Sequence, residues 1–289
     1  MTTGQANPPS PCKLSCVLLT WNSDSYVQRC LQSIFADLDA SSFSFEVIVI
    51  DNGSVDGTLG ALAALARPEL TVVPLSHNTG TTFSRNIGLR MSRGEYLAVL
   101  DSDIEIHQAG VFTQLLSFLD GKPDVGIAAP ELRFPSGRFQ KTTDVFPTLT
   151  HKFKRFLSLR AMEEEEGRQT RDTAPRNVDY AVSAFWAMPR KVLACVGLLD
   201  EKIFYAPEDV DYCLRVALSG LRVVYLPHLV ATHHAQEISR RKLLSKSFRE
   251  HLKGLAYFYR KHGFVWRLGG VYQRIAQAQS SRRSVGRTG

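Results

Sequence analysis

The sequence predicts an α/β protein with a doubly wound, mostly parallel β-sheet. Three observations support this fold class. Short apolar stretches, typical of buried strands, alternate with stretches of helical periodicity over roughly the first hundred residues. The stretches with strand character are continuous in Val, Ile and Leu, as in parallel strands that are covered on both faces. Polar and acidic side chains follow several of them directly, at the place where open α/β sheets bind ligands.

The expected elements of the first half follow one another in the order β-α-β-α-β-α-β. Strands are predicted at 14–20, 45–50, 70–75 and 97–101, and helices at 24–35, 55–66 and 82–92. Helical connections between parallel strands bring the carboxyl ends of the strands to one edge of the sheet. We therefore expect the polar residues that end these strands to line one crevice.

The second half of the chain is less regular. Helices are predicted at 111–119 and 208–219, and strands at 125–129, 180–188 and 221–226. The acidic run 163–166 is interpreted as a solvated helix face or loop. Residues 1–13 are polar and Pro-rich and are expected to be disordered.

The composition indicates a cytoplasmic protein. No apolar run reaches the length of a membrane-spanning helix, and the first residues lack the charged and apolar segments of a signal peptide. The five cysteines are odd in number and show no CxxC spacing. A disulfide framework or a zinc site is therefore not expected, and a reducing compartment fits best.

Two carboxylates, Asp101 and Asp103, follow the buried strand at 97–101, with Ser102 between them. A carboxylate pair with this spacing at a strand end can hold a divalent cation, and the cation can hold a diphosphate. The alternative is a solvated turn, since Asp and Ser are common turn residues.

A second acidic group, Glu208, Asp209 and Asp211, opens a predicted helix. Acidic residues are favoured in a first helical turn, so simple capping is one interpretation. A carboxylate beside a sugar-sized cleft can also act as general base on an acceptor hydroxyl. Further on, His233 follows a predicted strand. It is either a structural histidine or a residue that completes the shell of a cation near the Asp101–Asp103 pair.

Three other enzyme classes are disfavoured. No Gly-x-Gly-x-x-Gly follows the first strand, and no Walker phosphate loop is present, which argues against a dinucleotide oxidoreductase and a P-loop enzyme. A sugar nucleotidyltransferase needs a Gly-rich, basic loop after the first strand, and residues 20–24 are neither Gly-rich nor basic.

The C-terminal segment 240–289 differs in charge from the rest of the chain. It holds thirteen Lys and Arg residues and one acidic residue, Glu250, whereas the rest of the chain is mildly acidic. Apolar residues recur among the basic ones at helical spacing, which predicts a basic amphipathic helical tail. We expect it to contact an anionic membrane surface rather than nucleic acid, for which no role is expected. The alternative is that its apolar face packs on the body of the protein.

Several motifs occur in a fixed order along residues 14–240. They are Leu18–Asn22, Val47–Thr58, Asn78–Gly80, Arg85–Gly88, Gly94–Asp103, Val196–Glu201, Pro207–Arg215, Pro227 and His233. In this set the chain resembles the family 2 glycosyltransferases, and among them the rhamnosyltransferase-like bacterial members. The resemblance implies a GT-A type fold with a nucleotide-sugar half at 14–130 and an acceptor half at 131–239, followed by the tail at 240–289.

The resemblance also implies roles for particular residues. The nucleotide-sugar contacts would come from Thr20, Asn22, Asp51, Arg85, Asp101 and Ser102. Asp103 and His233 would hold Mg²⁺ or Mn²⁺. Asp209 would be the catalytic base, and Glu208 would support the acceptor. Trp186 and Asp211 are expected in the acceptor or sugar pocket, with core filling as the alternative for Trp186.

The resulting hypothesis is an inverting, metal-dependent glycosyltransferase of surface polysaccharide or glycolipid synthesis. It would transfer a sugar from a nucleoside-diphosphate sugar to a glycan or a lipid-linked acceptor, at the inner face of the cell membrane. The competing hypothesis is a non-catalytic module that binds a nucleotide sugar or an anionic surface.

Overall fold

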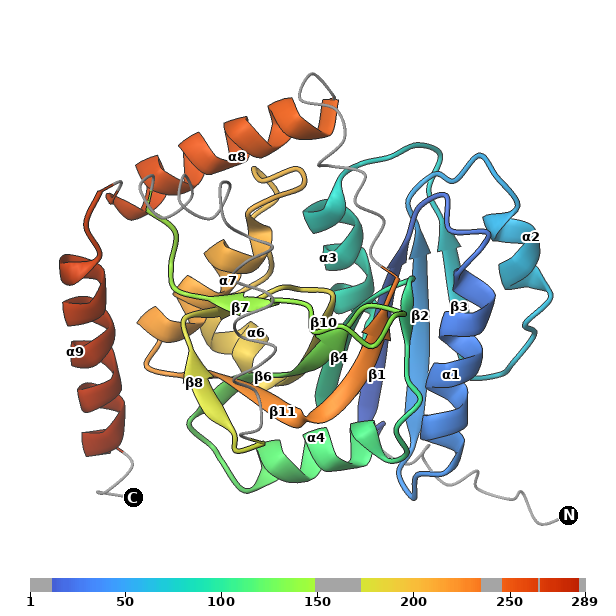
Figure 1. Ribbon diagram of the computed structural model, residues 1–289, viewed down its shortest axis with the longest axis horizontal. Coiled ribbons are helices and arrows are strands. Elements are labelled where there is room, and N and C mark those ends of the chain that lie inside the picture. Colours follow the sequence, from blue (N-terminus) through green and yellow to red (C-terminus); the bar gives the residue numbers. More distant parts are fainter. Residues whose placement is uncertain (1–11, 149–172, 235–245, 265, 286–289) are drawn as a thin grey trace, which may run out of the picture.

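A mixed β-sheet forms the centre of the protein (Figure 1). The structure is a computed structural model, and it describes residues 12–148, 173–234, 246–264 and 266–285. Within these residues the sheet has nine strands, of which eight follow the order β3-β2-β1-β4-β10-β6-β11-β5, while β8 pairs with β11. A small second sheet consists of β7 and β9.

The first half of the chain forms the parallel part of the sheet. Its strands are β1 (Leu14–Thr20), β2 (Phe45–Asp51), β3 (Leu70–Pro74) and β4 (Tyr96–Asp101). Helices α1 (Val27–Asp39), α2 (Thr58–Ala63) and α3 (Thr81–Met91) connect them. In the ladder Thr20 lies opposite Asp51, and Leu19 lies opposite Asp101. The prediction that these strand ends meet at one edge is therefore confirmed.

The second half adds antiparallel and parallel strands to the same sheet. These are β5 (Ile104–Glu105), β6 (Val125–Arg133), β8 (Arg176–Val178), β10 (Phe185–Pro189) and β11 (Arg222–His233). The strand expected at 180–188 is two strands, because β9 (Tyr180–Ala181) pairs with β7 (Thr143–Asp144) in the small sheet. The strand expected at 221–226 continues through a register shift to His233. That extension carries His233 to the carboxyl edge of the parallel strands.

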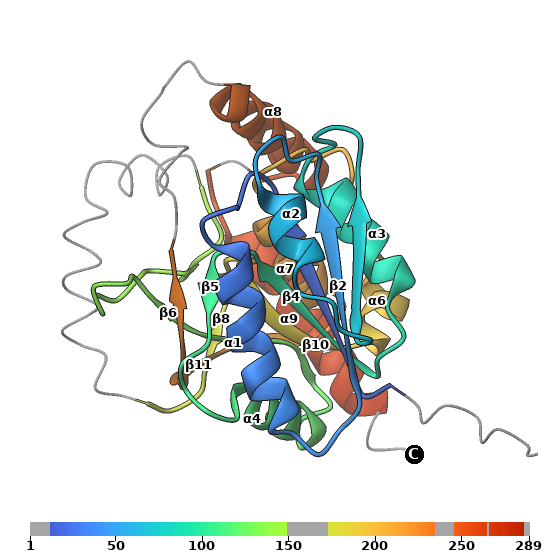
Figure 2. The same cartoon turned by 90° about the vertical axis from the view of Figure 1, so that its right-hand side faces the viewer.

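Helices cover both faces of the sheet (Figure 2). One core cluster joins the sheet to α1, α2 and α4 (Val111–Asp120). The other joins it to α3, α6 (Lys191–Val196), α7 (Glu208–Leu218), α8 (Lys246–His262) and α9 (Gly269–Val285). Both clusters are apolar, and both contain side chains that are fully buried. This is the doubly wound arrangement that the alternating pattern predicts.

The basic tail packs on the body through its apolar face. Leu255, Phe258 and Tyr259 of α8 are buried, as is Val271 of α9. A Cβ on Gly254 would lie 2.2 Å from the carbonyl oxygen of Ala206, so α8 touches the segment that precedes α7. These side chains are therefore unavailable to a membrane, and packing on the body is the correct alternative for this face. In the described part of the chain, no helix is both long and apolar enough to span a bilayer.

Two expectations concern residues near the gaps. Lys13 was expected in a disordered segment, but its backbone N–H donates to the carbonyl of Ser44 over 3.0 Å, and its carbonyl accepts from the N–H of Tyr96. Residue 13 is therefore part of the folded body, because its backbone bonds to the residue before β2 and to the first residue of β4. Residues 1–11, the acidic run 163–166 and, in the expected tail, residues 240–245, 265 and 286–289 lie outside the described residues.

Candidate active site

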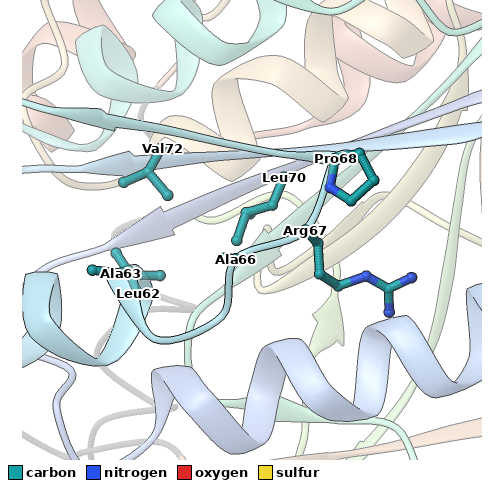
Figure 3. A pocket seen from close by; sticks show the side chains of 7 residues that line it. All are labelled: Leu62, Ala63, Ala66, Arg67, Pro68, Leu70 and Val72. Carbon is teal, nitrogen blue, oxygen red and sulfur yellow. The ribbon is translucent and has the colours of Figure 1, made fainter.

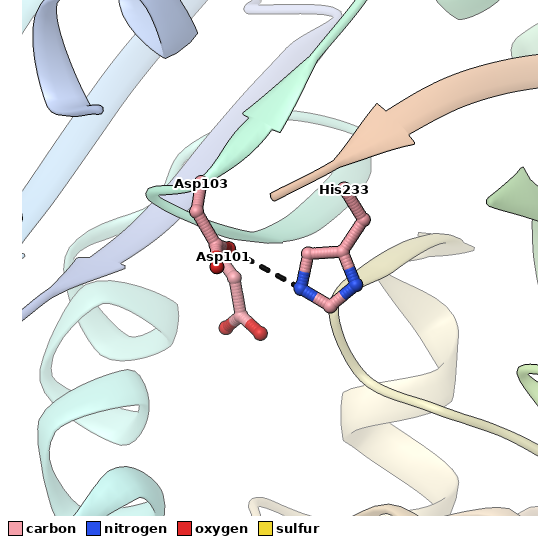
Figure 4. Close-up of side chains that lie close together, drawn as sticks. All are labelled: Asp101, Asp103 and His233. Atoms are coloured by element: carbon pink, nitrogen blue, oxygen red, sulfur yellow. Dashed lines mark ion pairs between the residues drawn. The ribbon is translucent and has the colours of Figure 1, made fainter. Parts of the chain in front are cut away.

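Asp101, Asp103 and His233 form an acidic and imidazole cluster at the carboxyl edge of the parallel strands (Figure 4). Each offers one ligand atom, and the three atoms lie within 4.8 Å of one another. Nε2 of His233 lies 3.3 Å from Oδ1 of Asp103. Because β5 pairs with β11, Ile104 lies opposite His233, and the N–H of His234 donates to the carbonyl of Asp103 over 2.9 Å. This pairing brings together residues that are far apart in the sequence.

The chemistry of this cluster suits a divalent cation. Two carboxylates supply the oxygen ligands that Mg²⁺ and Mn²⁺ prefer. The imidazole adds a nitrogen ligand, which Mn²⁺ also accepts. Burial raises the pKa of Asp101, and nearby Asp103 adds to this effect, although the charge of Arg85 opposes it. Burial would lower the pKa of His233, but the hydrogen bond and charge of Asp103 outweigh burial and raise it. Negative charge is thus crowded at a place where a cation would relieve it.

Arg85 links the Asp101–Asp103 pair to the acidic group at the start of α7. Its side chain is almost fully buried, and its guanidinium donates to Asp101 on one side and to Glu208, 3.4 Å away, on the other. It also donates to the hydroxyl of Ser183 over 2.5 Å and to the carbonyl of Ser183 over 3.1 Å. The expected contact of Arg85 with a nucleotide is therefore not what this geometry offers. Arg85 is buried and holds the carboxylates that face the site.

The neighbouring carboxylates of α7 have different surroundings. Glu208 is buried and accepts from Ser183 over 3.1 Å. Burial, together with the charge of Asp209, raises the pKa of Glu208 to about 8, against the opposing charge of Arg85. Asp209 is partly exposed, and its Oδ1 accepts from the N–H of Val210 over 2.8 Å. Of the two, Asp209 is the carboxylate that an incoming hydroxyl can reach.

The ends of β1 and β2 form the opposite side of the site. Thr20 is buried, and its hydroxyl is left without a hydrogen-bond partner among the described residues. Asp51 is fully buried, and its carboxylate accepts from the N–H of Ser54 over 3.0 Å and from the hydroxyl of Ser54. Asn22 has a positive φ of 50° and accepts from the N–H of Val55 over 2.9 Å. Asp51 and Asn22 thus shape the turn after β2, and Thr20 keeps an unused hydroxyl there.

Ser102 supports the turn between the two cluster carboxylates. Its hydroxyl lies 2.7 Å from the hydroxyl of Ser23, and both serines are buried. The N–H of Ser23 in turn donates to the hydroxyl of Thr58 at the start of α2 over 2.8 Å. Ser102 was expected to contact the nucleotide sugar, and the structure gives it a role in fixing this turn.

Two of the expected pocket residues lie elsewhere. Trp186 is 1% exposed, stacks on Tyr212 and donates from its indole to the carbonyl of Ala181 over 3.1 Å. It cannot stack on a sugar because both faces of β10 are covered by helices, so core filling is correct. Asp211 is also 1% exposed and is enclosed by Arg215, Lys261 and His262. Asp211 joins α7 to α8 rather than lining a pocket.

Two residues of the site gave weak signals in the sequence. Gln140 lies 2.9 Å from Nδ1 of His233, but a single glutamine in an irregular segment carries no pattern. Tyr205 is 42% exposed, although burial of its hydroxyl and the charges of Glu208, Asp101 and Asp209 raise its pKa to about 12. Its signal was its place in an aromatic pair shortly before the acidic group of α7. Tyr205 is therefore an exposed aromatic ring close to the acidic group of α7.

A separate apolar hollow lies between α2 and β3 (Figure 3). Leu62, Leu70 and Val72 are among its lining residues, and Arg67 is its charged lining residue. Arg67 pairs with Asp39, 2.8 Å away. With its charged side chain already paired, this hollow has none of the chemistry that the cluster at β4 provides.

Comparisons with known proteins identify the family to which the chain belongs. Residues 15–197 match the family model described as glycosyl transferase family 2. The chain is 26% identical over 270 residues to an N-acetylglucosaminyl-diphospho-decaprenol L-rhamnosyltransferase of Mycobacterium tuberculosis, covering 88% of this chain and 86% of that protein. It is 28% identical over 198 residues to the uncharacterized protein y4gI of Sinorhizobium fredii, covering 66% of this chain but 21% of y4gI.

A solved structure has a similar fold. It is the mannosyltransferase PcManGT from Pyrobaculum calidifontis in complex with GDP-Man and Mn²⁺. The likeness has a TM-score of 0.59 at 17% sequence identity and covers 96% of this chain and 72% of that one. At this level of identity the likeness concerns the fold.

Proposed function

The chain belongs to glycosyl transferase family 2, and we propose that it moves a sugar from a nucleoside-diphosphate sugar to a hydroxyl acceptor with the help of a divalent cation. It is a glycosyltransferase with a GT-A type fold, as the sequence predicts, and its relatives include rhamnosyltransferases. The observation that carries the proposal is the cluster of Asp101, Asp103 and His233 at the strand edge, which Arg85 connects to Glu208 beside Asp209.

Asp103 and His233 would hold Mg²⁺ or Mn²⁺, with Asp101 completing the protein ligands. The three ligand atoms lie close enough to share one ion, and PcManGT was solved with Mn²⁺. When bound, a divalent cation offsets the charge that develops on the diphosphate leaving group. Arg85 is too deeply buried to do this itself, and its contribution is to hold Asp101 in place.

The nucleoside of the donor would lie across the ends of β1 and β2. Thr20 supports this position because its buried hydroxyl has no partner within the described structure, and a ligand group can supply one. The turn at 51–54 forms the neighbouring wall, since Asp51 fixes it through two contacts to Ser54. A diphosphate placed beside Thr20 would extend toward Asp101 and Asp103, because β1 and β4 are adjacent strands.

Asp209 would remove the proton of the acceptor hydroxyl as that oxygen attacks the anomeric carbon. Its partner Glu208 is buried with a raised pKa, so the two carboxylates are separated in role by their surroundings. A single displacement on the face opposite the diphosphate inverts the anomeric centre. No second carboxylate is required as a nucleophile in such a step.

The acceptor would be a glycan or a lipid-linked sugar of polysaccharide synthesis. The mycobacterial relative is named for an N-acetylglucosaminyl-diphospho-decaprenol acceptor, which supports a lipid-linked sugar. Tyr205 supports an acceptor sugar on the α7 side, because its exposed ring lies near Glu208 and Asp209 and can stack on a sugar face.

The outer face of α8 would contact the anionic inner face of the cell membrane in the cytoplasm. Arg249, Leu252, Lys253 and Arg260 are exposed and recur at helical spacing. This surface is narrower than the amphipathic helix that the sequence suggests, because the apolar side of α8 is covered. Flotation on anionic and zwitterionic vesicles tests it. Wild-type protein should float with anionic vesicles only, and a variant with Arg249, Lys253 and Arg260 changed to Glu should not.

A thermal-shift panel tests the proposed donor chemistry. Nucleoside diphosphates and sugar nucleotides are each added with and without Mn²⁺. A ligand at 100 times its Kd stabilises the folded state by roughly 2.7 kcal/mol, which is measurable. A shift for one nucleotide that requires Mn²⁺ is the expected result. No shift with any nucleotide would contradict the proposal.

A further inference from the structure

Gln140 lies against the imidazole of His233 and has no role in the proposed transfer reaction. Its backbone N–H donates to the carbonyl of Leu132 over 3.1 Å, which fixes residue 140 beside the end of β6. From there its side-chain Oε1 lies 2.9 Å from Nδ1 of His233. An amide oxygen only accepts hydrogen bonds, so Nδ1 of His233 must carry the proton in this contact.

The contact with Gln140 decides which ring nitrogen of His233 faces the carboxylates. With the proton on Nδ1, a neutral imidazole presents the lone pair of Nε2, which lies 3.3 Å from Oδ1 of Asp103. In this tautomer Nε2 gives up the hydrogen bond that it makes to Asp103 when it is protonated, and a cation bound between Nε2 and Oδ1 takes the place of that proton. The other tautomer would place an N–H on Nε2, and His233 would then donate to Asp103 and have no lone pair for a cation there.

We propose that Gln140 is a positioning residue that holds His233 in its Nδ1-protonated tautomer and so prepares Nε2 to ligate the divalent cation. The inference rests on the proposed function, since it concerns the cation site of that function. Hydrogen-bond partners of metal-binding histidines orient the ring in this way, and their loss typically lowers metal affinity by about 10–100-fold.

Two substitutions separate this role from simple packing. Gln140→Met removes the acceptor at nearly constant size, whereas Gln140→Glu keeps an oxygen that accepts from Nδ1. Gln108→Met is the matched control, because Gln108 lies outside β11 but binds this strand, which carries His233, through its side-chain amide. The side chain of Gln108 accepts from the N–H of Val230 over 2.8 Å and donates to the carbonyl of His228 over 3.2 Å. Its loss therefore loosens β11 without removing the partner of His233.

The test uses the full-length protein and Mn²⁺ alone as the probe. Electron paramagnetic resonance of free Mn²⁺ gives the affinity, and two-bond ¹H–¹⁵N correlation spectra of metal-free protein at mildly alkaline pH give the tautomer of His233. Gln140→Met should bind Mn²⁺ about 10–100-fold more weakly and move His233 toward the Nε2-protonated tautomer. Gln140→Glu and Gln108→Met should keep the wild-type tautomer. Their affinity for Mn²⁺ should fall by less than about threefold.

The outcomes distinguish the inference from the function on which it rests. Equal affinity and an equal tautomer in wild type and Gln140→Met would overturn the inference and leave the proposed function standing. An equal loss of affinity in Gln108→Met would also overturn it, because the effect would then be a loosening of β11. A wild-type protein that binds no Mn²⁺ would overturn the cation site, and the inference with it.

Discussion

The buried guanidinium of Arg85 donates to the carboxylate of Asp101, and this ion pair joins α3 to the end of β4. Asp101 also belongs to the candidate cation cluster. Because the same guanidinium reaches Glu208 at the start of α7, one buried positive charge supports both the cation side and the acceptor side of the site. The relative position of these two sides therefore depends on Arg85.

Replacing Arg85 should be strongly destabilising. Arg85→Met would leave Asp101 without its counter-cation and Glu208 without a hydrogen-bond donor, and loss of one partner of a buried pair costs roughly 3–5 kcal/mol. Urea unfolding at neutral pH measures the change. Arg90→Gln, in the same helix, removes an exposed pair with Glu201 and should cost less than about 1 kcal/mol. Similar losses in the two variants would contradict the bridging role of Arg85.

Asp209→Asn should keep donor binding and lose transfer. The amide retains the shape of the side chain but cannot take the acceptor proton, so turnover should fall on the order of 10²–10⁴-fold. Binding of the donor nucleotide by calorimetry and release of nucleoside diphosphate measure the two properties separately. Asp124→Asn is the control, because Asp124 pairs with Arg222 at the start of β11, on the opposite edge of the sheet. Near-wild-type turnover by Asp209→Asn would exclude this residue as the base.

The parallel half of the sheet was predictable from the sequence, whereas the second half was predictable only in part. Uninterrupted apolar runs such as Val47–Ile50 indicate buried parallel strands. The polar residues that follow the runs, Asp51 and Asp101, then mark the strand ends. The extent of β11 was not predictable, because Pro227 interrupts its pattern and the strand passes it through a register shift. The length of β11 depends on its pairing with β6, which lies far away in the sequence, and a short stretch of sequence carries no sign of such pairing.

Within the site, residue type was predictable and exact role was not. Asp103 and His233 were expected together, and the pairing of β5 with β11 brings them together. Trp186 and Asp211 were assigned to a pocket because aromatic and acidic residues near a motif suggest ligand contact. Their burial depends on the helices that pack over them, above all α8, which lies far along the chain.

The close approach of α8 to the segment before α7 gives a stability prediction. Gly254→Ala should destabilise the protein by roughly 1–3 kcal/mol, because the new methyl group would meet the carbonyl oxygen of Ala206. Gly60→Ala is the matched change, since open space surrounds Gly60 in α2 and alanine favours a helix by roughly 0.5–1 kcal/mol. Thermal unfolding should show opposite signs. A neutral Gly254→Ala would mean that α8 does not pack closely there.

Asp211 should make stability depend on acid. Burial alone would raise the pKa of Asp211, but hydrogen bonds from His262 and Lys261 outweigh burial and lower the pKa to about 2. A carboxylate with a lowered folded-state pKa stabilises the protein above its unfolded pKa, near 4, and loses that contribution as the pH falls toward 2. The stability difference between wild type and Asp211→Asn should therefore shrink by about 2 kcal/mol between pH 6 and pH 2. Urea unfolding at both pH values measures it, and a constant difference would contradict the prediction.

The most direct test of the central claim is calorimetric titration of the donor nucleotide into wild type and Asp103→Ala, each with Mn²⁺ and with a chelator. Asp103→Ala removes one ligand of the cluster, and Asp39→Ala, which removes an exposed partner of Arg67, is the control. The account predicts that wild type and Asp39→Ala bind only with Mn²⁺ and that Asp103→Ala does not bind. Equal binding by Asp103→Ala, or wild-type binding that ignores the chelator, would contradict a cation site at Asp103.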